Sequence, residues 1–122
     1  MLNCEVLPDR GIVILTPDGK VGRTDFSKAA EDVDSLIASR GRITGLMIRA
    51  QSYQDWADFA DLVEELRFIQ RRGVPVDRVA GLSDGNLEKH LPAIADRLET
   101  REYRHFPFED REAGLDWLES GR

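Results

Sequence analysis

Short apolar runs alternate with longer amphipathic segments along this chain, and this alternation is the feature that most limits its fold. The run ITGLMIRA, residues 43–50, is apolar and β-branched, as in a strand buried on both faces. The segment after it, 55–72, has apolar residues at helical spacing. From residue 12 on, the runs begin about 25 to 33 residues apart, the usual length of a strand–helix–strand unit. Such units pair their strands in parallel.

The N-terminal part of the chain has a different pattern. Two apolar runs, 2–7 and 12–16, are separated only by the turn sequence Pro8-Asp9-Arg10-Gly11. A connection this short predicts an antiparallel hairpin. The remaining strands are expected at 74–82 and 101–106, with Pro75 at the beginning of its strand. The sequence therefore predicts an α/β fold: a mixed five-stranded sheet, antiparallel in its N-terminal hairpin and otherwise parallel, with four helices in one domain over residues 1–122.

Amphipathic periodicity and terminal residues predict where the helices lie. The four predicted helices span residues 24–41, 55–72, 87–99 and 110–119. Thr24 is expected to cap the first helix, and Gly41 to end it. Pro92 is expected to kink or restart the third helix, because proline lacks the N–H that continues the hydrogen-bond ladder. The last helix is expected to turn three side chains inward, namely Ala113, Trp117 and Leu118.

Composition and charge exclude several classes of protein. The net charge is −6 and the sequence pI is near 4.9, whereas nucleic-acid binders usually present a basic face, so we expect no nucleic-acid partner. No apolar run approaches the roughly 20 residues that a membrane-spanning helix needs, so no transmembrane segment is expected. Cys4 is the only cysteine, and no signal peptide is recognisable at the N-terminus. These features predict a cytoplasmic protein without disulfides.

The chemistry-bearing residues form no strong motif. His90 and His105 are the only histidines, and neither has a carboxylate or cysteine at ligand-like spacing, so we expect no metal and no other cofactor. His90 is expected on an exposed helix face, and His105 to point outward from its strand. Cys4 is interpreted as a small core hydrophobe, since nothing in the sequence indicates a base beside it. The sequence therefore predicts no catalytic residues.

A binding site is expected beyond the carboxyl ends of the parallel strands. The segment after residues 43–50 lies there and includes our candidate partner- or ligand-binding residues, Ser52, Tyr53, Trp56 and Phe59. Trp56 and Phe59 also have the spacing of a helix face packed on the sheet. The sequence leaves open whether Trp56 lies in the core, in an interface or beside a pocket.

Three segments, GRITGLMIRAQSYQDW, DRVAGLSD and YRHFPFEDREAGLDWLE, resemble the SpoIIAA-like family of small bacterial proteins. This family belongs with the STAS domains and is related in fold to the CRAL-TRIO lipid carriers. The resemblance covers nearly the whole chain and implies a STAS-type fold. In the anti-sigma-factor antagonists, the better-known STAS proteins, a phosphorylatable serine follows an aspartate at the start of the helix after the third strand. Here Asp55 matches the aspartate, but Trp56 replaces the serine, and Ser52 lies in the preceding loop.

The resemblance and the residues together leave three functional hypotheses. The first is a non-catalytic STAS-like interaction or regulatory module that lacks the phosphorylatable serine and binds a protein partner or itself, with a homodimer expected. The second is a carrier or sensor of a small apolar or lipid-like ligand, which the kinship with CRAL-TRIO proteins implies. The third is an enzyme, for which the sequence supplies no motif.

Overall fold

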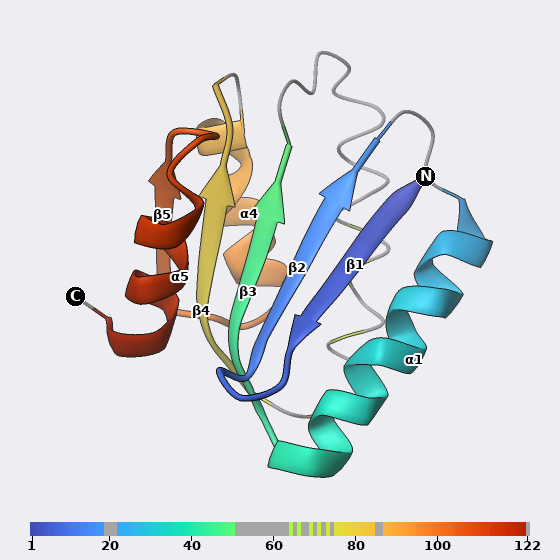
Figure 1. Ribbon diagram of the computed structural model, residues 1–122. Helices are drawn as coiled ribbons and strands as arrows, with labels where there is room; N and C mark the ends of the chain where they lie inside the picture. Colours follow the sequence, from blue (N-terminus) through green and yellow to red (C-terminus); the bar gives the residue numbers. More distant parts are fainter. Residues whose placement is uncertain are drawn as a thin grey trace.

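Five strands form a single sheet in the order β1-β2-β3-β4-β5 (Figure 1). The computed structural model describes residues 1–18, 22–50, 75–84 and 87–121, together with residues 64, 66, 69, 71 and 73. The strands are β1 (Leu2–Leu7), β2 (Ile12–Pro17), β3 (Ile43–Arg49), β4 (Val76–Leu82) and β5 (Glu102–Phe106). The β1–β2 pair is antiparallel and the other pairs are parallel, which confirms the predicted mixed sheet.

Three of the four predicted helices lie among the described residues. They are α1 (Arg23–Arg40), α4 (Leu87–Arg97) and α5 (Arg111–Ser120). The predicted helix 55–72 lies largely outside the described residues. Leu66 and Ile69, two members of its expected apolar stripe, are described and are fully buried.

The two faces of the sheet have separate cores, because side chains alternate between the faces along each strand. On one face, Val13, Leu46 and Val79 pack with side chains of α1 and α4. On the other, Ile14 and Met47 pack with side chains of α5. Figure 1 shows α4 behind the sheet and α5 in front of it. The sheet is therefore the central layer between helices, with β1 and β5 at its edges.

The packing of α5 depends on a glycine in β3. A Cβ atom at Gly45 would lie only 2.7 Å from the Cβ of Leu118, so the missing side chain lets the helix approach the strand. Trp117 and Leu118 face inward as predicted, but the prediction for Ala113 is wrong, since Ala113 is exposed. The buried positions of α5 are Gly114, Leu115, Trp117 and Leu118, an arc of the helix that leaves residue 113 outside.

The predicted N-cap of α1 is also wrong. Gly22 occupies the N-cap position, and its N–H donates to Oδ2 of Asp25 at 2.9 Å. A carboxylate three residues after the cap satisfies this backbone donor, so Thr24 falls in the first turn of the helix instead. At the other end the prediction is confirmed: Gly41 has φ of 78°, and its N–H donates to the carbonyl of Ile37 at 2.7 Å.

Helix α4 runs through Pro92 without a restart. Pro92 is exposed, whereas its neighbours Leu91 and Ile94 are buried against the sheet. The carbonyl that Pro92 leaves without a helical partner belongs to Glu88, in the first turn, where water can replace the lost bond. Burial of the apolar face therefore keeps the helix continuous across the proline.

Candidate functional site at the strand ends

The carboxyl ends of β2, β3, β4 and β5 lie along one edge of the sheet, at the top of Figure 1. This is the edge where the sequence placed a binding site. The four candidate residues Ser52, Tyr53, Trp56 and Phe59 follow β3 in the chain and lie outside the described residues. The described part of the site consists of the ends of β3 and β4 and the β5–α5 connection.

Ser83 and His105 form a polar pair at the ends of β4 and β5. The hydroxyl oxygen of Ser83 lies 3.0 Å from Nε2 of His105, and the Ser83 N–H donates to the carbonyl of Phe106 at 3.1 Å. Ser83 is only 3% exposed, and His105 is half-buried. His105 was expected to face outward from its strand; it is only partly exposed and lies beside Ser83, a neighbour that was not predicted from the sequence.

This pair has the residue types of a nucleophile and its base, but not their accessibility. An attacking hydroxyl must reach a substrate carbonyl, and a base is usually oriented by a third group. The Ser83 hydroxyl is buried between the strand ends, so its hydrogen bond to His105 joins β4 to β5. The arrangement is suited to holding the sheet edge together.

Arg49 and Asp84 hold the β5–α5 connection at Phe108. The guanidinium carbon of Arg49 lies 4.2 Å from the centre of the Phe108 ring, and Nε donates to the Phe108 carbonyl at 3.4 Å. On the other side, Oδ1 of Asp84 accepts from the Phe108 N–H at 3.2 Å. Cation–π contact and hydrogen bonds together place an aromatic ring beside a cation at the end of β3.

At the other end of the same edge, the N-terminus connects β1, β2 and α1. The terminal ammonium of Met1 donates to the Asp18 carbonyl at 2.7 Å and lies 3.9 Å from Oδ2 of Asp25. A hydrogen bond from the backbone of Gly22, together with the terminal charge and the N–H of Leu2, holds the pKa of Asp25 below its usual value. This carboxylate therefore ties the start of the edge strand to the start of α1.

Cys4 is half-buried in β1 and packs against the core under α1. Burial raises the pKa of its thiol to about 12, and the negative charge of Asp32 and a hydrogen bond to it act in the same direction. A thiol with this pKa is protonated at neutral pH, so it is a poor nucleophile. Its setting agrees with the interpretation of Cys4 as a small hydrophobe.

His90 is half-buried on α4, which corrects the expectation of an exposed position. Desolvation, followed by the charge of Lys89, lowers its pKa. Within the described part of the chain, no group of three His, Cys, Asp or Glu residues is placed to hold a metal ion. In that same part, no helix is long and apolar enough to cross a membrane.

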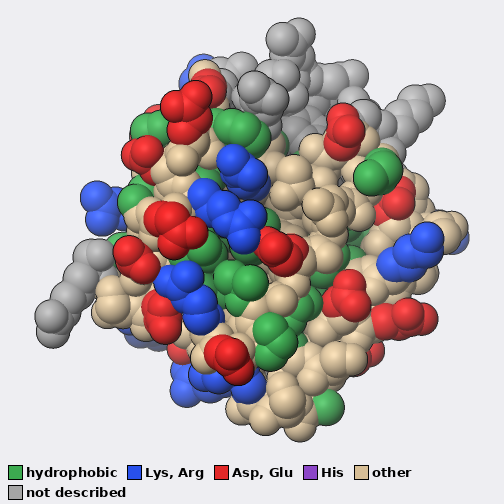
Figure 2. Space-filling model, in the orientation of Figure 1, with side chains coloured by type: hydrophobic (Ala, Val, Ile, Leu, Met, Phe, Trp, Pro, Cys, Tyr) green, Lys and Arg blue, Asp and Glu red, His purple; other side chains and the backbone are tan. Residues whose placement is uncertain are grey.

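The face that carries α5 mixes charges of both signs (Figure 2). Ion pairs connect the helix and strands on this side, including Arg111 with Glu5 at 2.6 Å and Arg78 with Glu102 at 2.7 Å. Exposed pairs of this kind contribute little to stability, on the order of 0–1 kcal/mol each. Basic and acidic side chains therefore lie interspersed on the described part of this face.

The sequence of this chain matches a model of a known protein family. A family model described as SpoIIAA-like matches residues 12–119, which includes every described element except β1 and the last residue of α5. A search of curated proteins returns no significant match.

Proposed function

Because this chain belongs to the SpoIIAA-like family, within the STAS-domain superfamily, we propose that it is a non-catalytic protein-interaction or regulatory module. The observation that best supports this proposal is the buried hydrogen bond between Ser83 and His105, because this described serine–histidine pair joins two strands. Trp56, at the position of the phosphorylatable serine in related STAS proteins, cannot accept a phosphate. The module therefore acts by binding, without its own phosphorylation switch.

The proposed contact surface is the segment with Ser52, Tyr53, Trp56 and Phe59. Arg49 and Phe108 lie where this segment begins and add a cation and an aromatic ring to the same edge. Arginine and aromatic residues are enriched in protein interfaces, which supports a protein as the partner. A second copy of this chain is the partner that we propose first, so the protein is expected to be a homodimer.

The core position of Leu66 and Ile69 divides the apolar stripe of this segment into two parts. Both side chains are fully buried, so these two downstream members of the expected stripe pack in the molecule itself. Trp56 and Phe59 belong to the upstream part of the sequence pattern, which follows β3 in the chain. We propose that this upstream part contributes to the interface. The test is the association state after both aromatic side chains are replaced by alanine.

The alternative proposal is a carrier or sensor of a small apolar ligand. It is favoured by a cavity of about 200 Å³ between β1 and α1, whose lining includes Val6, Pro8 and Leu36. Sites for drug-sized ligands are usually larger, about 300–1,000 Å³. Native mass spectrometry of freshly purified protein tests this alternative, because a retained ligand would add a discrete mass. A cytoplasmic location is part of both proposals, since a lone cysteine fits a reducing compartment.

A further inference from the structure

The outer edge of β1 has backbone groups that face away from the sheet. Met1 and Asp18 exchange two hydrogen bonds, of 2.7 and 2.8 Å, and are therefore a hydrogen-bonded pair of the antiparallel ladder. Hydrogen-bonded and non-hydrogen-bonded pairs alternate along an antiparallel hairpin. Leu2, Cys4 and Val6 are therefore in non-hydrogen-bonded pairs and direct their N–H and C=O groups outward, away from β2. The N–H of Leu2 follows this rule, since it donates to Asp25 on α1.

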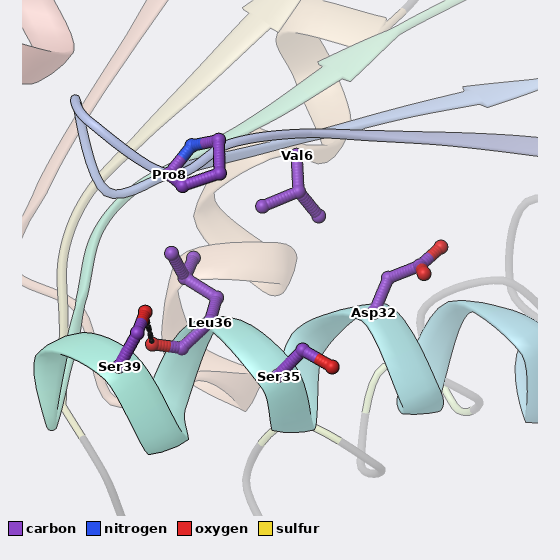
Figure 3. Close-up of a pocket in the computed structure, with 6 residues that line it drawn as sticks. All are labelled: Val6, Pro8, Asp32, Ser35, Leu36 and Ser39. Carbon is purple, nitrogen blue, oxygen red and sulfur yellow. Dashed lines mark hydrogen bonds between the residues drawn. The ribbon is translucent and has the colours of Figure 1, made fainter.

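A groove lies beside this edge, between the hairpin and α1 (Figure 3). Its volume is about 200 Å³. Figure 3 shows Val6 and Pro8 on the hairpin facing Leu36 on the helix. The lining residues are Val6, Pro8, Asp32, Ser35, Leu36 and Ser39. The groove thus has an apolar floor and a polar helix wall, next to the outward backbone groups of Cys4 and Val6.

Asp32 gives the groove its charge. Among the described residues that line the groove, only Asp32 has an ionisable side chain, and the contact described for it is the hydrogen bond with the neutral thiol of Cys4. A carboxylate beside the outward-facing backbone groups of Cys4 and Val6 is complementary to a cationic side chain of an added strand. An extended peptide that pairs with a sheet edge takes affinity from backbone hydrogen bonds and specificity from alternate side chains.

We propose that the outer edge of β1 binds an extended segment of a partner protein as a sixth strand. In this arrangement the segment pairs with the backbone of Cys4 and Val6, a Lys or Arg side chain faces Asp32, and an apolar side chain covers Val6 and Leu36. This surface goes beyond the proposed strand-end interface and is separate from it.

A second copy of this chain fits the edge less well. Antiparallel pairing of two β1 strands centred on Cys4 places Asn3 opposite Glu5, and the β1 sequence LNCEVL offers no cation to either Asp32. Two carboxylates would then face an interface without a counter-charge, which is unfavourable. The occupant with the better charge match is a basic, partly apolar segment of another protein.

The experiment uses a phage library of random 12-residue peptides selected on the full chain. Peptides enriched on the wild type are expected to alternate apolar residues with at least one Lys or Arg. Asp32→Lys should weaken the best peptide at least tenfold, and Asp32→Asn should weaken it less. Glu31→Lys is the matched control, because it makes the same charge change on an exposed position of α1 outside the groove, and it should bind within about threefold of the wild type.

Amide NMR shifts locate the bound peptide. The largest changes are expected at Cys4, Val6 and Leu36, and binding should survive replacement of Trp56 and Phe59, which separates this surface from the strand-end interface. The proposal is overturned if no peptide is enriched, if Asp32→Lys binds as well as the wild type, or if the shifts lie elsewhere. It is also overturned if Val6→Pro converts a wild-type dimer to monomers, since the edge would then pair two copies.

Discussion

The carboxylate of Asp32 on α1 accepts a hydrogen bond from the thiol of Cys4 on β1, so the helix and the edge strand meet at a charged group. The charge of Asp32 disfavours the thiolate, which adds to the effect of burial on the Cys4 pKa. Asp32→Asn should therefore lower this pKa from about 12 toward the ordinary value. The pH dependence of iodoacetamide alkylation measures it, with Glu31→Gln as control. An unchanged midpoint in Asp32→Asn would show that the two side chains are not coupled.

The raised pKa of Cys4 also predicts a loss of stability at high pH. The thiol titrates near 9 in the unfolded chain and near 12 in the folded protein, so between these values only the unfolded state releases the proton. The unfolded state is then stabilised, and the free energy of unfolding should fall as pH rises from about 9 toward about 12. Urea denaturation at pH 8 and pH 10.5 measures the fall. Cys4→Ala should show a smaller fall, and equal falls in both proteins would contradict the assignment.

Two glycines in the sheet predict different costs for the same substitution. A Cβ at Gly45 meets the Cβ of Leu118 at 2.7 Å, so Gly45→Ala must move helix α5 and should cost about 1–3 kcal/mol. A Cβ at Gly81 meets Cδ2 of Leu91 at 2.6 Å, the flexible end of a side chain that can rotate. Gly81→Ala should therefore cost less. Urea denaturation measures the free energy of unfolding of both variants. A larger loss of stability in Gly81→Ala than in Gly45→Ala would contradict this prediction.

Proline substitutions test which backbone N–H groups of β1 face away from the sheet. Val6→Pro removes an N–H that faces outward, whereas Glu5→Pro removes one that bonds to β2. Glu5→Pro should lower the free energy of unfolding by about 1–3 kcal/mol through its lost hydrogen bond, and Val6→Pro by less than Glu5→Pro. Thermal and urea denaturation compare the two. Equal losses would mean that the outer edge of β1 is not open.

The sheet could be predicted from the sequence because its strands are marked by strong local patterns. Apolar runs, a four-residue hairpin turn and regular spacing between runs indicate where β1 to β5 lie along the chain and that the N-terminal pair is antiparallel, without knowledge of any contact. The confirmed end of α1 at Gly41 has the same origin, since a left-handed backbone favours glycine. These features depend on residues close together in the chain.

Most features that were not predicted from the sequence depend on contacts between residues far apart in the chain, and the start of α1 is a local exception. Thr24 is a good capping residue, but the position of Asp25 moved the start of α1 to Gly22. His105 is bonded to Ser83, 22 residues away, and only the register of β4 and β5 brings them together. The sequence did hold a signal for this contact, since Ser83 directly follows β4 and His105 lies near the end of β5. The groove beside β1 was missed because it depends on how α1 packs on the hairpin.

The association state of the full chain tests the central proposal most directly. Sedimentation velocity over a range of concentrations should show a dimer for the wild type and a monomer for the double variant Trp56→Ala/Phe59→Ala, with circular dichroism confirming that the variant is folded. Tyr103→Ala is the matched control, because it removes an aromatic ring that is 45% exposed on β5, and it should remain a dimer. A wild type that stays monomeric, or a folded double variant that still forms dimers, would contradict the proposal that this segment is the interface.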